Sequence, residues 1–173
     1  AAFDESLPGD NSNLVWWKLY NASPADPTNR ITRHLSIAFA AGASYNADKC
    51  HLHVRRRGTP VDNLLTFELC ANNAGDPGTV LQTVTKNAAI LTDTVSFYSV
   101  FDWTGTQALV SGTTYHIKVY GGANDTAANH WEVLCNSSGT SSKYSAAGSA
   151  WTTSNVSMYY RVTDTDTARK WLF

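Results

Sequence analysis

The sequence predicts an all-β protein, an antiparallel sandwich or barrel preceded by an N-terminal arm. Apolar and polar residues alternate along most of the chain, which is the pattern of strands with one buried face. Clusters of Gly, Asn and Ser separate these short stretches, as turns do in all-β proteins. Thr occurs 20 times and Glu only three times, a composition that favours strands over helices.

Composition limits the classes of function. The 173 residues suffice for one domain with its own core, without metal or disulfide support. A net charge of −1 gives no general attraction to nucleic acid or anionic lipid, and no apolar run approaches the ~20 residues of a membrane span. We therefore expect neither a nucleic-acid partner nor a membrane partner.

The cysteines do not suggest a disulfide scaffold. Three residues, Cys50, Cys70 and Cys135, cannot all pair within one chain. Cys50 and Cys135 fall in inward-facing phases, so they form either a bridge or two buried thiols. Cys70 falls in the opposite phase and has no evident partner.

Residues 1–30 differ from the rest because they hold Pro8, Pro24 and Pro27, with Asp, Asn and Ser between them. They contain one apolar island, residues 14–20, with Trp16, Trp17 and Tyr20. Two adjacent tryptophans are costly to leave in water. We therefore expect this N-terminal arm to dock, either on its own domain or on a neighbouring subunit.

From residue 31 the period of the apolar pattern is two, and eight or nine short strands follow up to residue 163. No alternation of strands and helices is present, so the sheets should be antiparallel. We expect a domain over residues 31–163 and a C-terminal tail over 164–173. The residues expected to face inward are, in order, Ile31, Leu35, Ile37 and Phe39, then Cys50, Leu52 and Val54, then Leu65, Phe67 and Leu69, then Val95, Phe97, Phe101 and Trp103, then Tyr115, Ile117 and Val119, then Trp131, Val133 and Cys135, then Val156, Met158, Tyr160 and Val162.

One segment carries a family likeness. In residues 109–119 a Leu precedes a Gly-Thr turn, and a Tyr then starts an alternating apolar strand. A strand with a Gly-Asp-Pro-Gly turn precedes this segment, at residues 64–78, and Trp131 and a Gly-Ser-Ala-Trp turn at 148–151 follow it. This layout resembles carbohydrate-binding-like jelly-roll modules of bacterial surface proteins and bacteriophage structural proteins. The resemblance implies an antiparallel two-sheet jelly-roll β-sandwich with an extended N-terminal arm, and a carbohydrate-binding role without fixed ligand residues.

His51 and His53 are two residues apart on a predicted strand, so both point to the same face. Such a pair can share a metal, with His34 or His116 as a third ligand. The metal-binding jelly rolls called cupins also need a Glu four or five residues after the second His, where Arg57 stands instead. The alternative is a set of surface histidines, and we expect no metal and no cofactor.

The carboxylates do not indicate catalysis. Glu68 and Glu132 are the two Glu residues on predicted strands, and both fall in polar phases. A glycosidase would use such a pair across its substrate, but the local motifs of these enzymes are missing. We expect two solvated carboxylates and a protein that is not an enzyme.

Aromatic residues near loops are the candidates for stacking on a sugar. Six Trp and eight Tyr occur, and the alternative for most of them is burial in the core. The glycan-binding candidates are Trp103, His130, Trp131, Tyr144 and Trp151.

The candidates for assembly contacts lie in the arm, in one basic run and at the C-terminus. On a strand, Arg55 and Arg57 would face one way and Arg56 the other. This run is either a solvated strand end or a contact with a neighbouring subunit. The assembly candidates are Trp16, Trp17, Tyr20, Arg55, Arg56, Arg57, Trp171 and Phe173.

Our leading hypothesis from the sequence is a non-catalytic structural protein of an assembly, a bacteriophage virion surface component such as a capsid decoration or a tail or fibre protein. It would self-associate or bind other virion proteins through its apolar termini. The alternative is a secreted or surface-borne glycan-binding module, and a remote alternative is a glycoside hydrolase.

Overall fold

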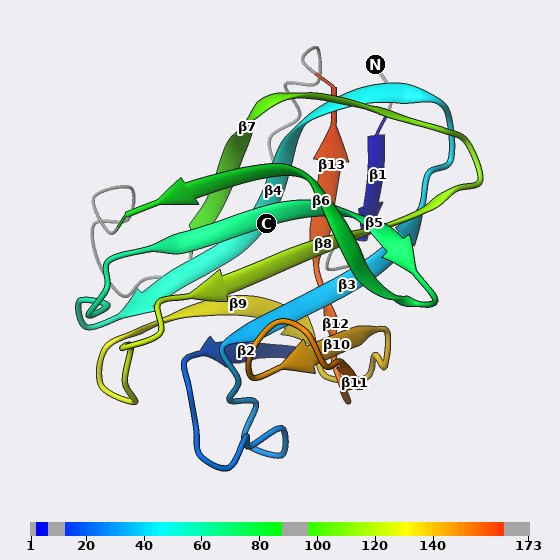
Figure 1. Ribbon diagram of the computed structural model, residues 1–173. Coiled ribbons are helices and arrows are strands. Elements are labelled where there is room, and N and C mark those ends of the chain that lie inside the picture. Colours follow the sequence, from blue (N-terminus) through cyan, green and yellow to red (C-terminus); the bar gives the residue numbers. More distant parts are fainter. Residues whose placement is uncertain (1–2, 7–12, 88–96, 165–173) are drawn as a thin grey trace.

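The computed structural model describes residues 3–6, 13–87 and 97–164 of the chain (Figure 1). These residues form strands and loops and no helix, and the strands make two antiparallel sheets. The predicted all-β, two-sheet fold is therefore confirmed. Within this described part, no helix could span a membrane.

The seven-stranded sheet, here called sheet A, contains both strands of the N-terminal arm. Its strand order is β1 (Phe3–Ser6), β13 (Tyr160–Thr163), β4 (Tyr45–Arg57), β9 (His130–Asn136) and β12 (Ser157–Met158). Two further strands join this path, β2 (Leu14–Leu19) beside β9 and β7 (Phe97–Leu109) beside β4.

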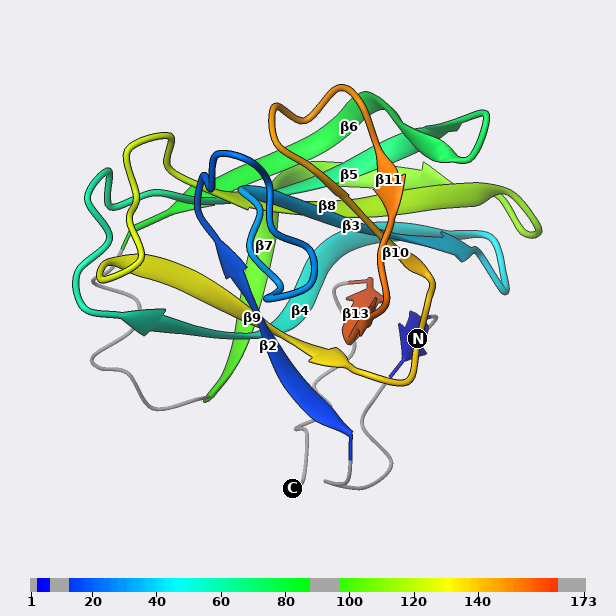
Figure 2. The same cartoon turned by 90° about the horizontal axis from the view of Figure 1, so that it is seen from below.

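The six-stranded sheet, here called sheet B, forms the second layer. Its order is β11 (Thr152–Thr153), β10 (Ser142–Ser145), β3 (His34–Ala40), β8 (Thr114–Gly121), β5 (Leu65–Asn73) and β6 (Asp76–Lys86). Figure 2 shows β6, β5, β8 and β3 in one layer and β9, β2 and β4 in the other.

The core lies between the two layers and contains the residues that the alternation predicts. Buried apolar side chains come from β3, β4, β5, β8 and β9, with β2, β7, β12 and β13 adding further members of the cluster. Every predicted inward-facing residue whose side chain is described belongs to this core except Ile31, which is half-buried. Val95 lies outside the described residues, and the side chains of Phe97 and Phe101 are outside them too.

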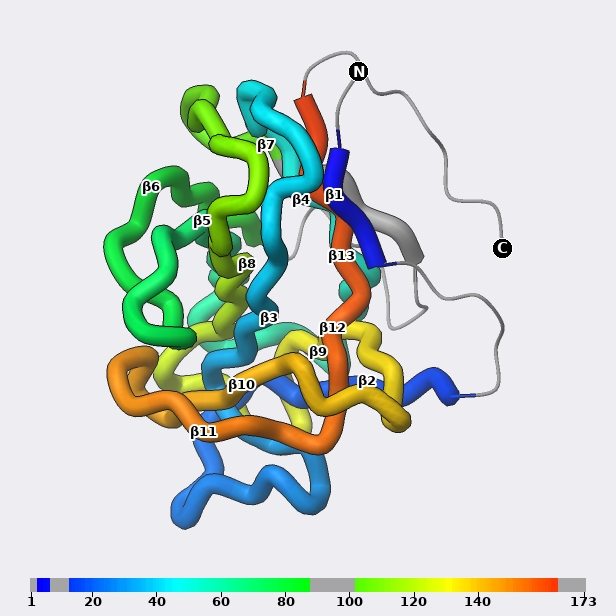
Figure 3. The backbone as a smooth tube through the Cα atoms, turned by 90° about the vertical axis from the view of Figure 1, so that its right-hand side faces the viewer, coloured from blue at the N-terminus to red at the C-terminus, as the bar shows by residue number. Residues whose placement is uncertain are grey.

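The N-terminal arm docks on its own domain, which decides between the two alternatives left open by the sequence. β1 pairs with β13, and β2 pairs with β9 along its whole length (Figure 3). Trp17 and Leu19 are fully buried, and the Trp17 indole donates to Thr32 Oγ1 at 3.1 Å. Trp17 is thus a core residue of this chain, and its ring is not available to a neighbouring subunit.

Two loops at one end of the sandwich are tied together. They are residues 58–64, after β4, and residues 122–129, before β9. The Asp62 carboxylate accepts hydrogen bonds from the backbone and the side-chain amide of Asn124, at 2.8 and 2.9 Å. Asp125 in turn accepts from the Asp62 backbone N–H at 3.1 Å. These bonds fix the end of β4 relative to the start of β9.

Gly58 makes the turn that follows β4. Its φ of +60° lies in the left-handed region, and a Cβ at this position would collide with the side chain of Asn129. The same Asn129 side chain accepts a hydrogen bond from the Thr59 backbone N–H at 3.0 Å. The turn therefore ends β4 at Arg57, directly beside the first residue of β9.

The two adjacent tryptophans of β2 give a test of this docking. Trp17→Ala removes a fully buried ring from the core, so we expect it to lower the free energy of unfolding by about 3–5 kcal/mol. Trp16→Ala removes a half-buried ring from the outer face, and we expect a loss of about 1–2 kcal/mol. Urea unfolding followed by circular dichroism measures both.

Trp16→Ala is the matched control, because it removes the same side chain from the neighbouring position of the same strand. Equal effects of the two substitutions, or no effect of Trp17→Ala, would contradict the docking of β2.

Candidate functional site

A charged cluster lies on the outer face of sheet A, where β2, β9 and β4 are neighbours. The register places Glu132 of β9 between Lys18 of β2 and Arg55 of β4. The next outward-facing residue of β9, His130, is paired with Arg57. Their sequence neighbours Trp17, Val54 and Trp131 belong to the core, so the side chains of the cluster share the outer face.

Glu132 is the centre of this cluster and is only 1% exposed. Arg55 Nε donates a hydrogen bond to Glu132 Oε2, and His130 Nε2 lies 3.0 Å from Glu132 Oε1. Burial by itself raises the pKa of Glu132, but the hydrogen bonds from His130 and Arg55 and their charge outweigh it. The net result is a pKa below the usual value of Glu, so the carboxylate is ionised at neutral pH.

His130 is held from both sides. Its Nδ1 lies 2.9 Å from the Thr126 carbonyl oxygen, which can only accept a hydrogen bond, so Nδ1 is the donor. Its Nε2 faces Glu132 and donates to it when both ring nitrogens carry a proton, and its ring packs against the Tyr20 ring with 4.8 Å between centroids. Tyr20, which follows β2, thereby covers the histidine.

Arg55 is held by Trp16 as well as by Glu132. The guanidinium carbon lies 4.1 Å from the centroid of the Trp16 ring, a cation–π contact. Its charge is therefore committed to the cluster. Strands β2, β4 and β9 each contribute one member of this Trp16–Arg55–Glu132 set.

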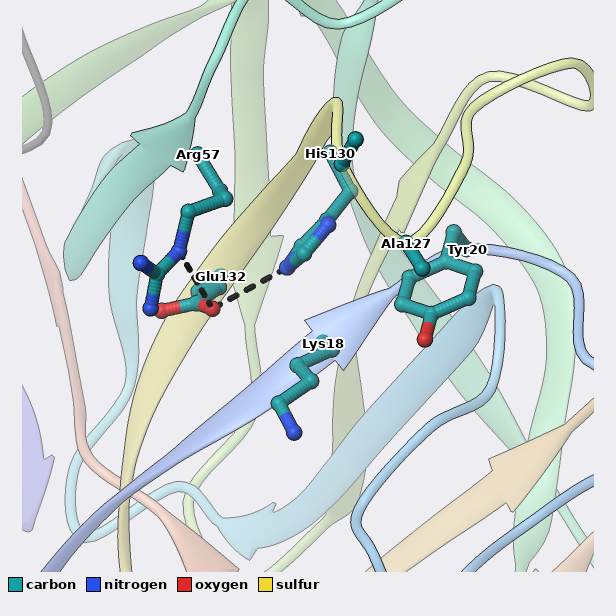
Figure 4. A pocket seen from close by; sticks show the side chains of 7 residues that line it. Lys18, Tyr20, Arg57, Ala127, His130 and Glu132 are labelled. Carbon is teal, nitrogen blue, oxygen red and sulfur yellow. Dashed lines mark hydrogen bonds and ion pairs between the residues drawn. The ribbon is translucent and has the colours of Figure 1, made fainter.

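A pocket of about 350 Å³ opens beside the cluster (Figure 4). Its wall contains Lys18 and Tyr20 from the arm, Arg57 from the end of β4, and His130 and Glu132 from β9. Two alanines of the loop before β9, Ala127 and Ala128, complete the lining. In Figure 4, His130 and Glu132 lie between Arg57 on one side and Tyr20 on the other.

Tyr20 offers this pocket a ring and a hydroxyl group. Burial and the negative charges of Asp26 and Glu132 raise its pKa above the usual value of Tyr. The hydroxyl is therefore protonated at neutral pH and can donate or accept a hydrogen bond.

The predicted glycan-binding residues do not form one site. Trp103 and Trp131 are buried in the core, 5% and 0% exposed, so their ring faces are not available to a ligand. His130 is the one glycan candidate that lines the described pocket.

Tyr144 and Trp151 belong to the other sheet. Tyr144 of β10 is half-buried and stacks on Trp17 with 5.9 Å between ring centroids. Trp151 is half-buried beside β11 and meets the ring of His34 edge-on at 6.5 Å.

The predicted assembly residues lie closer together than the predicted glycan-binding residues do. Arg55 and Arg57 share one face, as the strand pattern predicts, and Trp16 and Tyr20 join them from the arm. Arg56 lies at the strand end, where its guanidinium is 3.4 Å from the Gly58 carbonyl oxygen. Trp171 and Phe173 lie outside the described residues.

The two strand glutamates were expected to be solvated, and this expectation is wrong for both. Glu68 is 7% exposed because Lys118 and Tyr120 cover it, and Tyr120 donates a hydrogen bond to it at 2.9 Å. Glu132 is covered by Arg55 and Arg57. Glu68 is on β5 of sheet B and Glu132 on β9 of sheet A, and both point away from the core. Because stacked sheets are about 10 Å apart, these two cannot act as a catalytic pair.

The histidines were expected to lie on the surface, and they are buried instead. Burial is the main cause that lowers the pKa values of His34, His51, His53 and His116 to about 4. Among the residues that the structure describes, no three His, Cys, Asp or Glu side chains are grouped so that they could hold a metal ion.

The cysteine alternatives are decided in favour of thiols. Cys50, Cys70 and Cys135 are all free and buried. Burial raises the pKa of each thiol, to about 12 for Cys70, so none of them is a thiolate at neutral pH.

Sequence reasoning missed Lys18 and the role of Glu132. The signal for Lys18 is present in the arm, because Trp16, Lys18 and Tyr20 alternate with Trp17 and Leu19 as on a strand. The neighbour of this strand is not readable from the pattern, since pairing with β9 is a long-range contact.

Comparisons with known proteins add no relative: a scan against protein-family models finds no matching family, and a search of curated proteins finds no match.

The buried histidines predict acid sensitivity. Each pKa lowered to about 4 means that the fold holds the neutral ring, while the unfolded chain protonates it near pH 6.5. The resulting stability is complete above pH 6.5 and is lost as the pH falls from 6.5 to 4. We expect a slope of up to about 1.4 kcal/mol per pH unit for each such histidine, measured by urea unfolding.

His116→Gln provides the matched comparison, because it removes one titrating ring while keeping a side chain able to donate to Asn72. Its slope should be shallower than that of the parent chain. A stability that does not change between pH 6.5 and 4 would contradict the burial of these rings.

Proposed function

We propose that this chain is a non-catalytic glycan-binding module and that the pocket beside Glu132 is its ligand site. The observation that carries the proposal is the composition of the pocket wall: the cations Lys18 and Arg57 and the ring of Tyr20 surround a space of about 350 Å³. Ligand sites with volumes of ~300–1,000 Å³ are typical for small molecules.

The side chains on this wall are of the kinds that bind sugars. The apolar face of a sugar ring packs on an aromatic ring, and its hydroxyl groups accept hydrogen bonds from ammonium and guanidinium groups. His130 and Glu132 form the floor of the pocket. This floor is rigid, because the two side chains are hydrogen-bonded to each other and to Thr126 and Arg55. A rigid floor supports binding because little conformational freedom is lost when the ligand arrives.

The state of Glu132 supports a non-catalytic role. Glu132 is the one carboxylate on the pocket wall. Its lowered pKa makes it a poor proton donor, and its partners Arg55 and His130 hold both of its oxygens. Glycosidases need a second carboxylate across the substrate, and Glu68 lies on the opposite sheet.

The resemblance to carbohydrate-binding-like jelly-roll modules supports a carbohydrate as the ligand. Such modules occur on bacteriophage particles and in secreted bacterial proteins, so we propose the virion surface or the extracellular space as the location. Binding of a host glycan is compatible with a structural role in a virion.

The assembly hypothesis stays a prediction. Its argument from the arm is weakened, because β2 supplies Trp17 and Leu19 to the core of its own domain. Deletion of residues 1–30 would therefore damage the fold rather than release a subunit, and the solution mass of the full chain is the better measurement.

Binding of the full chain to a glycan array, followed by calorimetry on a positive glycan, tests the proposed site. Tyr20→Ala and Arg57→Ala should each weaken binding by about tenfold or more, because each removes part of the pocket wall. Tyr20→Phe separates the hydroxyl group from the ring.

Lys49→Ala is the matched control, since Lys49 belongs to the same strand as Arg57 and is paired with Asp102, away from the pocket. It should bind as the parent chain does. Loss of binding in Trp151→Ala but not in Arg57→Ala would instead place the glycan site on sheet B.

A further inference from the structure

We infer that the ligand of this pocket is an acidic sugar, whose carboxylate group binds between Lys18 and Arg57. This inference rests on the proposed function, because it names the class of glycan that the same pocket accepts. It follows from an imbalance of charge on the outer face of sheet A.

Cations outnumber carboxylates in the cluster. Lys18, Arg55 and Arg57 share the face with one carboxylate, Glu132. Arg55 neutralises most of that negative charge, because it is hydrogen-bonded directly to Glu132 and is held there by the cation–π contact with Trp16. The positive charge that remains belongs to the two cations that line the pocket.

Arg57 is only loosely attached to the cluster. Its Nε lies 4.0 Å from Glu132 Oε1, which is beyond hydrogen-bonding distance, and its side chain is 58% exposed. The oxygen that it faces is already bonded to His130. The guanidinium can therefore turn to a ligand without breaking a hydrogen bond to Glu132.

Lys18 is the second cation available to a ligand. Its backbone is hydrogen-bonded to the segment that follows β2, at Arg30 and Thr32, while its side chain lines the pocket. The carboxylate of Asp26 interacts with this ammonium group through charge, and both oxygens of Asp26 accept hydrogen bonds from Asn29. Among the residues that the structure describes, no carboxylate forms an ion pair with this ammonium group.

The surroundings of these two cations favour a carboxylate over a phosphate. A guanidinium forms two parallel hydrogen bonds with either group, so Arg57 by itself does not distinguish them. Helix N-termini and glycine-rich backbone nests are common additional binding groups for phosphate. The described part of the chain forms no helix, and no glycine is among the residues that line this pocket.

The remainder of the pocket indicates a sugar rather than a simple carboxylic acid. Tyr20 lines the pocket together with the two cations and adds an aromatic ring and a hydroxyl group to the wall. This ring gives the ligand an apolar contact, and the hydroxyl gives it a neutral hydrogen-bonding partner. A carboxylate bound by charge alone would use neither.

Calorimetry on the full chain tests the inference with ligands that differ in one property. The probes are the methyl glycosides of glucuronic acid and of N-acetylneuraminic acid, the methyl ester of each, glucose 6-phosphate and acetate. We expect the chain to bind at least one of the two acids about tenfold or more tightly than its ester, and to lose this preference at high salt.

Variants assign the preference to the two cations. Arg57→Gln and Lys18→Gln should each reduce the ratio of acid to ester affinity by about tenfold, because each removes a positive charge and keeps a side chain that can donate a hydrogen bond. Lys49→Gln, on the same strand as Arg57, should leave the ratio of acid to ester affinity unchanged. Equal urea midpoints for the three variants show that the fold is retained.

The outcomes separate the inference from the function on which it rests. Equal binding of acid and ester would overturn the acidic-sugar inference and leave a glycan-binding module. Tighter binding of glucose 6-phosphate than of either acid would overturn the carboxylate assignment, and equal binding of acetate would overturn the sugar. If neither these probes nor any glycan of the array binds, the proposed function fails as well.

Discussion

A carboxylate removed from water must be compensated by charge and hydrogen bonds, and Glu132 meets this requirement with side chains from its own strand and a neighbouring one. Arg55 comes from β4, and His130 comes from β9 itself. Trp16 of β2 then covers Arg55, so the arm helps to close the cluster. Because the negative charge of Glu132 neutralises only part of the positive charge around it, the pocket beside Glu132 stays cationic.

The N-terminal arm connects the fold with the site. One face of β2 gives Trp17 and Leu19 to the core, and the other face gives Trp16 and Lys18 to the charged cluster. The same pairing with β9 produces both results, since side chains alternate along a strand. A segment that resembles an assembly arm in the sequence is therefore part of the sandwich and of the candidate site.

The sequence predicts the fold better than the site, for a physical reason. Alternation is local, so the inward-facing residues of β3, β5, β8 and β9 follow from the pattern. Burial of Glu68 and of the histidines does not follow, because it depends on side chains that long-range pairing brings over them. Lys118 covers Glu68 from the neighbouring strand, and Arg55 covers Glu132 in the same way. The pattern predicts which way Arg55 and Arg57 point, but not the strand that they meet.

The ionisation of Glu132 is the central claim, and a ¹³C NMR titration of the glutamate carboxyl groups tests it most directly. With three glutamates in the chain, Glu132→Gln assigns the signal by its disappearance. We predict that this carboxyl titrates clearly below the usual Glu value of about 4.3. Titration at or above that value would show that Arg55 and His130 do not hold the carboxylate, and would contradict the charged cluster and the cationic pocket derived from it.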